Sequence, residues 1–293
     1  MNIFVTGSGG FLGSYFRHFN TLKGHHVIYG SVSNGSDHDF VRVNDLYSNV
    51  GDVLSSADVD AIIHFATVIP KSFDEAGFEN VFLPNVTMMG NLYSFAVRKK
   101  IAKFIYVSSF GSMKRPEHLD IRDFYTLSKV AGEHFCSMME ARGIQTASLR
   151  ISSPYGEYSR AATVMNIFIE RALNNEDIHV YGSGNRQQNF IYAGDITSAI
   201  ELCLQKSISG IYSIVSKRNV TMLDLARLII TLTKSGSKTV LGSREDPQED
   251  YVPRYTYKRA RMELGYEPRY SVRQGLIRYI GWLTARDRRR FIE

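Results

Sequence analysis

Tyr125 and Lys129 are four residues apart and form the pair in this sequence best suited to proton transfer. In a helix, positions i and i+4 share a face, so the two side chains would be neighbours. A lysine ammonium favours the phenolate and lowers a phenol pKa that starts near ~10. We therefore expect Tyr125 to serve as a general acid or base near neutral pH. The spacing alone is common, and a surface pair on an amphipathic helix has it too.

Ser108 and Ser109 follow an apolar, strand-like run at 103–107. Ligands of parallel sheets bind outside the carboxyl ends of the strands, where a hydroxyl can hold the reacting oxygen of a substrate. Turn formation after a strand is the other role open to these serines. Together with Tyr125 and Lys129, we interpret Ser109 as the third member of a catalytic set.

A glycine-rich run follows the first strand-like segment and opens a helix, with the sequence Thr6-Gly7-Ser8-Gly9-Gly10-Phe11-Leu12-Gly13. Gly7 permits a tight turn, Gly10 lets the backbone approach a pyrophosphate, and Gly13 allows close packing of helix on strand. The helix start offers free N–H groups and the positive end of the dipole. The run predicts a dinucleotide site that includes Phe11 and Leu12.

The second strand-like segment, 27–29, ends without the acid that binds the adenosine ribose in NAD-selective sites. Ser31 stands in its place, and no carboxylate there repels a 2′-phosphate. No arginine beside it favours NADP, so the sequence leaves NAD and NADP both open. Asp45 and Leu46 could cap the adenine ring, although Asp45 could equally be the polar end of a strand.

Elements that position these residues alternate regularly over the first half of the chain. Strands are predicted at 3–6, 27–29, 41–43, 61–65, 103–107 and 147–150, and helices at 14–22, 84–99 and 124–142. Near-continuous apolar strands separated by helices are typical of a parallel sheet covered on both faces. Right-handed crossovers then give a doubly wound α/β fold of the Rossmann type.

After Ile151 the pattern loosens into short strands, loops and helices. We expect a dinucleotide-binding domain made of residues 1–153 and about 189–220. A smaller, discontinuous α/β substrate lobe would contain about 154–188 and 221–293.

Composition narrows the class of protein. The chain has 293 residues, of which 44% are hydrophobic and 22% charged, as in ordinary globular proteins. It has no apolar run of the ~20 residues that a membrane span needs, and no signal segment is visible, so we expect a cytoplasmic protein without a membrane partner. Cys136 and Cys203 have no metal-ligand or disulfide spacing, and no metal site is expected.

The net charge of +6 is concentrated near the C-terminus, where residues 254–293 hold eleven Lys/Arg and four Asp/Glu. Such a segment suits an anionic ligand or a solvated helix face. No aromatic residues interleave with the basic run at 286–290, so we expect no nucleic-acid partner.

Taken together, these motifs resemble the extended short-chain dehydrogenase/reductase superfamily, in its nucleotide-sugar epimerase/dehydratase/reductase branch. The likeness covers nearly the whole chain. Its motifs are the glycine loop at 6–13, HFA at 64–66, Asn85 in a helix after a proline, VSS at 107–109, YxxSK at 125–129, LRISSPYG at 149–156, VYGSG at 180–184, NFIYAGD at 189–195 and LGYEP at 264–268.

The resemblance implies roles for particular residues. Ser109, Tyr125 and Lys129 would be the catalytic triad, and Tyr125 and Lys129 would bridge substrate and nicotinamide. Other residues would line the cofactor site, namely Asp45, Leu46, Phe65, Ala66, Asn85 and Ser152. The segment from Ser152 to Tyr155 would approach the nicotinamide and the sugar. A nucleotide-sugar substrate and a homodimer are implied as well.

Two departures from the family pattern narrow the expected activity. Phe110-Gly111 stands where 4,6-dehydratases resemble one another in an Asp-Glu pair, which argues against a dehydratase. Gln188 replaces the arginine that often binds the substrate diphosphate. Arg186, Arg244 or Arg254 could take over as bidentate phosphate ligands, although each could also be a surface arginine.

Three functions remain open. A 4-keto-sugar reductase is slightly favoured, because the chain is short for an epimerase of this branch and the missing ribose-binding acid permits NADPH. A 4-epimerase with tightly bound NAD is the alternative. A non-catalytic NAD(P)-binding scaffold is the third possibility, and the intact Ser109, Tyr125 and Lys129 set argues against it.

Overall fold

The computed structural model describes residues 1–31, 40–42, 54, 58–70, 75–113, 123–242 and 244–290. The chain forms two compact units, which we describe separately. Unit 1 contains Met1–Ile151, Thr197–Ile214 and Tyr257–Tyr266, and unit 2 contains Ser152–Ile196, Val215–Thr256 and Glu267–Glu293. Residues 257–266, which the sequence analysis assigned to the substrate lobe, belong to unit 1, where Arg259 donates to the carbonyls of Ser209 and Ile211.

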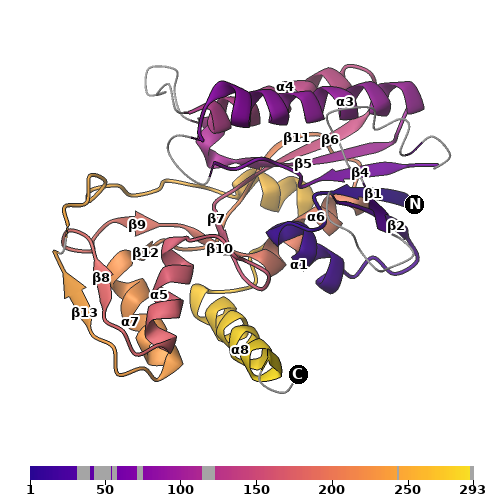
Figure 1. The fold of residues 1–293 in the computed structure, drawn as a ribbon. Helices are drawn as coiled ribbons and strands as arrows, with labels where there is room; N and C mark the ends of the chain where they lie inside the picture. The colour runs from indigo at the N-terminus through magenta and orange to yellow at the C-terminus, as the bar shows by residue number, and fades with distance from the viewer. Residues whose placement is uncertain are drawn as a thin grey trace. The chain divides into compact units, whose positions relative to one another are not determined.

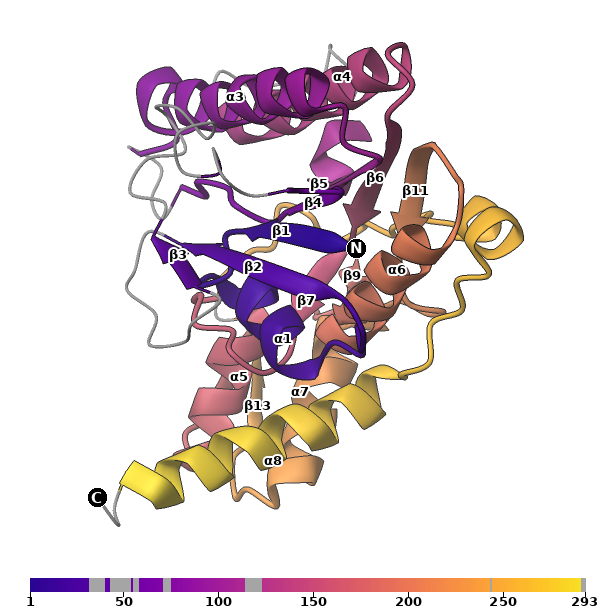
Figure 2. The ribbon, with the colours of Figure 1, turned by 90° about the vertical axis from the view of Figure 1, so that its right-hand side faces the viewer.

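Unit 1 is built on a parallel sheet of seven strands among the described residues, in the order β3-β2-β1-β4-β5-β6-β11. The strands are β1 (Asn2–Thr6), β2 (His26–Ser31), β3 (Phe40–Arg42), β4 (Ala61–His64), β5 (Lys103–Ser109), β6 (Gln145–Ile151) and β11 (Gly210–Ile214). Helices α3 (Leu83–Lys99) and α4 (Phe124–Glu140) cover one face, and α1 (Phe11–Phe19) and α6 (Ala193–Gln205) the other (Figures 1 and 2). The doubly wound fold predicted from the sequence is confirmed.

Short helical turns complete unit 1. They are η1 (Phe78–Phe82), which leads into α3, η2 (Phe110–Met113), which follows β5, and η4 (Ala260–Leu264).

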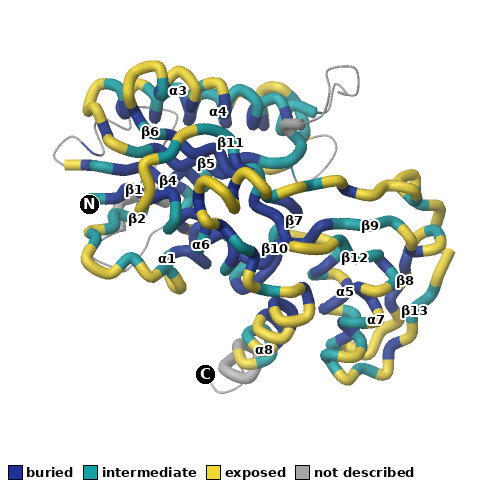
Figure 3. The backbone as a smooth tube through the Cα atoms, turned by 180° about the vertical axis from the view of Figure 1, so that it is seen from behind, coloured by how far each residue is buried: buried dark blue, intermediate teal, exposed yellow. Residues whose placement is uncertain are grey.

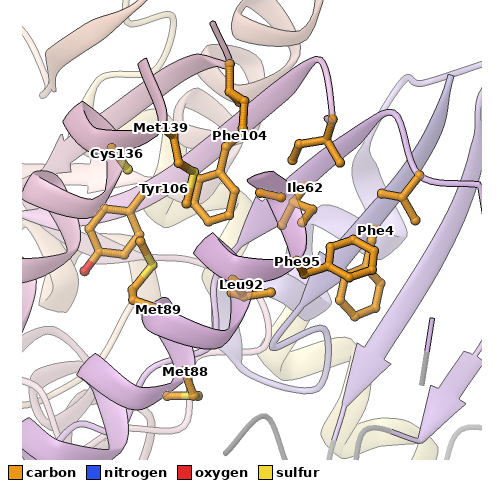
Figure 4. Close-up of a cluster of buried hydrophobic side chains, with 14 of the residues drawn as sticks. Phe4, Ile62, Met88, Met89, Leu92, Phe95, Phe104, Tyr106, Cys136 and Met139 are labelled. Atoms are coloured by element: carbon orange, nitrogen blue, oxygen red, sulfur yellow. The ribbon is translucent and has the colours of Figure 1, made fainter. Parts of the chain in front are cut away.

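The main core of unit 1 lies between the sheet and the helices α3 and α4 (Figure 4). Phe4, Ile62 and Phe104 come from three neighbouring strands, and Leu92 and Met139 from the two helices; each is at most 1% exposed. In the tube view the central strands β1, β4, β5 and β6 are largely buried (Figure 3). Burial of this apolar surface fixes the carboxyl ends of β1 and β5, where the predicted site residues lie.

Two helical glycines in this layer offer a matched test of the packing. A Cβ on Gly132 of α4 would lie 2.4 Å from the hydroxyl oxygen of Tyr106, whereas on Gly90 of α3 it would only touch the Phe135 ring at 3.8 Å. We expect Gly132→Ala to lower the free energy of unfolding by about 1–3 kcal/mol through overpacking. Gly90→Ala should raise it by about 0.5–1 kcal/mol through helix propensity. Equal effects in urea unfolding would contradict the close contact of α4 with Tyr106.

Over its described residues, unit 2 contains three pairs of short strands. They are β7 (Ser153–Tyr155) with β10 (Phe190–Tyr192), β9 (Gln187–Gln188) with β12 (Val220–Thr221), and β8 (Ile178–Val180) with β13 (Thr239–Leu241). The helices are α5 (Val164–Leu173), α7 (Met222–Thr233) and α8 (Val272–Arg290). None of the helices in the described ranges is both long and apolar enough to span a bilayer.

Candidate active site

In the glycine loop between β1 and α1, backbone packing requires a glycine at positions 7 and 13 but not at position 10. Gly7 has a φ of +68°, and a Cβ there would lie 2.5 Å from the Ala66 nitrogen. A Cβ on Gly13 would lie 2.2 Å from the Gly7 carbonyl oxygen. Gly10, the N-cap of α1, has a φ of −76°, and its Cβ would meet only the Gly7 oxygen at 3.3 Å. A side chain at Gly10 therefore needs only a small shift of the Gly7 oxygen, whereas one at Gly7 or Gly13 would clash with backbone.

This loop can hold a pyrophosphate. Gly10 caps α1 without a side-chain hydrogen bond, and no acidic residue lies in the first turn. The N–H groups of Phe11, Leu12 and Gly13 begin the helix, and such groups with the helix dipole attract anions. Because Gly10 has no side chain, the space beside these N–H donors is open to a pyrophosphate.

Residues after β4 brace the loop. The Ala66 N–H donates to Thr6 Oγ1 at 3.3 Å, and Thr6 Oγ1 is hydrogen-bonded to His64 Nδ1 at 2.7 Å. The Phe65 ring lies 5.6 Å from that of Phe16 on α1. Phe65 and Ala66, predicted to line the cofactor site, thus lie against the glycine loop and α1.

Asn85 on α3 ties this segment to α4. Its Oδ1 accepts the Val68 N–H at 2.7 Å, and its Nδ2 donates to the Val68 carbonyl at 3.0 Å and to Ser128 Oγ at 3.1 Å. Ser128 Oγ in turn donates to the Tyr125 carbonyl at 2.7 Å. Asn85 is 6% exposed, so its amide holds the segment after β4 and the first turn of α4 in place.

The structure does not describe the side chains of three predicted cofactor residues. Asp45 and Leu46 lie outside the described residues. Ser31 is the last residue of β2, which runs two residues beyond the strand expected at 27–29, and its side chain is outside the described part.

Tyr125 and Lys129 share a face of α4, with Lys129 Nζ 5.5 Å from the centroid of the Tyr125 ring. The predicted fall in the tyrosine pKa is wrong, because burial raises the pKa of Tyr125 to about 12. Sequence spacing could show the neighbouring lysine but not the desolvation around the phenol. Tyr125 is therefore a protonated phenol at neutral pH, which is the form that donates a proton.

Lys129 is also buried, at 4% exposure. Burial lowers its pKa to about 7, and the charge of Glu133 acts in the opposite direction. Its Nζ donates to the Val107 carbonyl at 3.0 Å. At neutral pH this amine therefore exists in both protonation states.

Ser109 lies beside the start of α4. The Gly111 N–H donates to Ser109 Oγ at 3.2 Å, and a Cβ on Gly111 would lie 2.9 Å from Thr126 Oγ1 and 3.6 Å from Ser109 Oγ. The structure thus brings Ser109 to the helix turn that carries Tyr125.

A partly buried ion pair beside this site was not predicted from the sequence. Arg150 on β6 binds both carboxylate oxygens of Glu133, at 2.9 and 2.7 Å, and Ser108 Oγ donates to the same carboxylate at 2.6 Å. The available signal was the spacing, since Glu133 follows Lys129 by four residues as Lys129 follows Tyr125.

Within unit 2, the predicted substrate contact of Tyr155 needs correction. Tyr155 is 1% exposed, its hydroxyl donates to the Val272 carbonyl at 3.3 Å, and its ring packs on that of Tyr192. It is a core residue of this unit, where Gly275 makes room for its hydroxyl. Ser152 is also 6% exposed and donates to Asn189 Oδ1 at 2.8 Å.

The candidate phosphate ligands of unit 2 differ in the contacts that their side chains make with other residues of the unit. Gln188 Nε2 donates to Ser153 Oγ. Arg186 Nε lies 3.1 Å from Asp246 Oδ2, a contact of opposite charges without hydrogen-bond alignment. Arg244 is exposed and lies over the Tyr181 ring at 5.8 Å, and Arg254 is exposed. Of the three arginines, Arg186 already has a carboxylate neighbour within its own unit.

The buried amine of Lys129 predicts a pH-dependent stability. Its pKa of about 7 in the folded protein lies below the ordinary lysine pKa of 10.5, so folding opposes protonation, and the whole energetic penalty applies below pH 7. Lys129→Met should raise the free energy of unfolding of the ligand-free protein by roughly 4 kcal/mol at pH 7 and roughly 2 kcal/mol at pH 9. The gain vanishes as pH rises through 10.5. Urea unfolding at several pH values, with the exposed Lys23→Met as control, measures it; a gain independent of pH would contradict the buried charge.

The chain is similar in sequence and in fold to known proteins. The chain is 25% identical, over 98% of its length and 99% of the relative, to a putative UDP-glucose 4-epimerase from Methanocaldococcus jannaschii. It is also 25% identical, over 100% and 95%, to a dTDP-glucose 4,6-dehydratase from Streptomyces niveus. A UDP-glucose 4-epimerase from Thermotoga maritima, solved with UDP-glucose, has the same fold, with a TM-score of 0.84 at 23% identity and 100% of both chains covered.

A family model agrees with these relatives. The model described as the NAD dependent epimerase/dehydratase family matches residues 3–215, which include the glycine loop, Ser109, Tyr125 and Lys129. The match spans most of the chain, and the chain belongs to this family of enzymes, the NAD-dependent epimerases and dehydratases.

Proposed function

We propose that this protein moves a hydride between a nicotinamide cofactor and a sugar carbon of a nucleotide-activated sugar, with Tyr125 as the acid/base. The observation that carries the proposal is the grouping of Ser109, Tyr125 and Lys129 in unit 1, which also carries a glycine loop that leaves space for a pyrophosphate at Gly10. The nicotinamide, when bound, supplies or accepts the hydride.

The residues divide the remaining work. Ser109 Oγ binds the reacting oxygen of the sugar, and Tyr125 gives its proton to that oxygen or removes one from it. Lys129 stabilises the tyrosinate that forms when the proton has left, since an adjacent cation favours the charged phenol. Phe110 and Gly111 offer no carboxylate for β-elimination, which disfavours a dehydratase despite the dehydratases among the relatives.

Within this class we propose 4-epimerisation with retained cofactor as the primary activity, because relatives over the full length are named UDP-glucose 4-epimerases. A 4-keto-sugar reductase is the second candidate. The absence of an acidic residue at Ser31, which permits NADPH, favours it. Arg186, Arg244 and Arg254 are the proposed contacts for the substrate diphosphate, and a homodimer is the proposed assembly.

Purification followed by two assays tests these candidates. An epimerase should release bound NAD on denaturation and interconvert C4 epimers of a UDP- or dTDP-hexose, followed by proton NMR. A reductase should be purified without cofactor and oxidise NADPH or NADH only with a 4-keto-6-deoxy sugar nucleotide. Absence of both activities in a protein that binds NAD(H) would overturn the proposal and favour the scaffold.

Cofactor choice gives a separate prediction. Ser31 ends β2 without a negative charge, so we expect NADPH to be tolerated beside NADH. Ser31→Asp should weaken NADPH binding relative to NADH by roughly 1–3 kcal/mol, the scale of a partly desolvated like-charge contact. Titration calorimetry at one ionic strength measures the ratio, with Ser31→Asn as the uncharged control. An unchanged ratio would place the ribose elsewhere.

A further inference from the structure

Four polar residues form a row across the buried sheet of unit 1. Thr6 on β1, His64 on β4, Tyr106 on β5 and Ser148 on β6 are direct neighbours in the strand register. All four are at most 3% exposed. Buried polar groups in a sheet need hydrogen bonds or other partners, because each group loses hydration on folding.

Stacking and hydrogen bonds link three members of the row. The His64 ring lies 5.7 Å from the Tyr106 ring with an angle of 18° between the planes, and His64 Nδ1 is hydrogen-bonded to Thr6 Oγ1. Burial, with a smaller contribution from the charge of Lys129, lowers the pKa of His64 to about 3. His64 is therefore neutral at working pH and adds no positive charge behind Tyr106.

Tyr106 lies directly under the lysine of the proposed site. Lys129 Nζ is 5.1 Å from the centroid of the Tyr106 ring, within the range of a cation–π contact. The phenol end of Tyr106 abuts Gly132 on α4, and only a glycine leaves room for it. Helix and strand thus hold the ring against the turn of α4 that carries Lys129.

Other groups facing Lys129 do not replace this contact. The Val107 carbonyl accepts one hydrogen bond, and the Glu133 carboxylate is bound by Arg150 and Ser108. The Glu133 charge raises the Lys129 pKa and so acts in the same direction as the ring, and burial raises the pKa of the neighbouring Tyr125 phenol to about 12.

We infer that Tyr106 is a positioning residue for the reaction, whose ring face holds the Lys129 ammonium beside Tyr125 and sets the charge of that lysine. The neutral His64 ring supports Tyr106 from the neighbouring strand. The importance of Lys129 in catalysis rests on the proposed function, whereas its contact with Tyr106 does not.

The inference is tested by changing the electron density of the ring at position 106 while keeping its shape nearly constant. Phenylalanine and its mono-, di- and trifluorinated analogues are introduced in place of Tyr106, and the 13Cε signal of Lys129 is titrated in ligand-free protein by NMR. Lys129→Arg identifies the signal. Each fluorine weakens the negative face of the ring, so the Lys129 pKa should fall progressively, by roughly 0.5–1 unit over the series. A flat or rising series would overturn the inference, since a purely structural ring does not respond to electronics.

Catalysis supplies the second readout. In Tyr106→Leu, which removes the ring, the pH limb of kcat/KM assigned to Lys129 should move by a similar amount, and in Tyr106→Phe it should stay in place. If Tyr106→Leu does not fold, the fluorinated series decides alone. Loss of the proposed activity in wild type with a progressive NMR shift would refute the function and keep the Tyr106 contact. If the enzyme is active but the Lys129 pKa does not change with fluorination, the proposed function stands and the role of Tyr106 is refuted.

Discussion

Tyr125→Phe is expected to lower kcat by roughly 10²–10⁴-fold while cofactor and substrate bind nearly as in wild type. The change keeps the ring, which packs beside Lys129 at 5.5 Å from its Nζ, and removes only the transferable proton. The backbone around the ring should be unaffected, because Ser128 binds the Tyr125 carbonyl and not its hydroxyl.

The control is Tyr93→Phe on α3, where the half-buried ring packs on Phe135 and under Arg142. It should leave kcat within about twofold of wild type, as expected for a hydroxyl outside the reacting group. Single-turnover rates with deuterated substrate establish that hydride transfer limits kcat. A loss of less than about tenfold in Tyr125→Phe under those conditions would rule out Tyr125 as the principal acid/base.

Gly10→Val should weaken NAD(H) binding by a hundredfold or more, about 2.7 kcal/mol, while the protein stays folded. A side chain at Gly10 would occupy the space where the pyrophosphate approaches the backbone. The φ of −76° and ψ of 177° at Gly10 are acceptable to valine, and a Cβ there meets only one atom at 3.3 Å. The free energy of unfolding without ligand should fall by about 1–2 kcal/mol, because valine is a poorer N-cap than glycine and the Gly7 oxygen must shift slightly.

Substitutions at two other glycines serve as comparisons for Gly10→Val. Gly77 is also an N-cap, with a φ of −80° and a ψ of 172° and nothing within 4 Å of its Cβ, so Gly77→Val is the matched control that keeps cofactor binding. Gly13→Ala should instead destabilise the fold, because its Cβ would lie 2.2 Å from the Gly7 oxygen. Unchanged NAD(H) affinity of folded Gly10→Val by calorimetry would refute the assignment of the loop.

Local signals in the sequence predicted most elements of the fold. The helix expected at 84–99 is Leu83–Lys99, with Pro84 in its first turn and the left-handed Lys100 at its end. The strand Gly210–Ile214 was missed, because its pairing with β6 depends on residues some 60 positions earlier in the chain. The helix expected from Ser14 begins at Phe11, directly after the glycine loop.

The candidate site was predicted less completely than the fold. Spacing identified Tyr125, Lys129 and Ser109, since these depend on one helix and one strand end. Tyr106 and Glu133 were missed, because their contacts with Lys129 and Arg150 depend on how α4 packs on the sheet. The same packing buries Tyr125, which is why the expected direction of its pKa was wrong.

The position of β11 has a consequence for synthesis of the chain. β6 ends at Ile151, and its neighbour on the far side, β11, begins only at Gly210, after the whole of Ser152–Ile196 has been made. Until then β6 is an edge strand with largely buried residues and a row of unpaired N–H and C=O groups, the kind of surface that recruits other nascent chains. A ribosome that pauses within those 58 residues (152–209) leaves this edge open, so we expect slow translation of this segment to favour aggregation of the nascent chain.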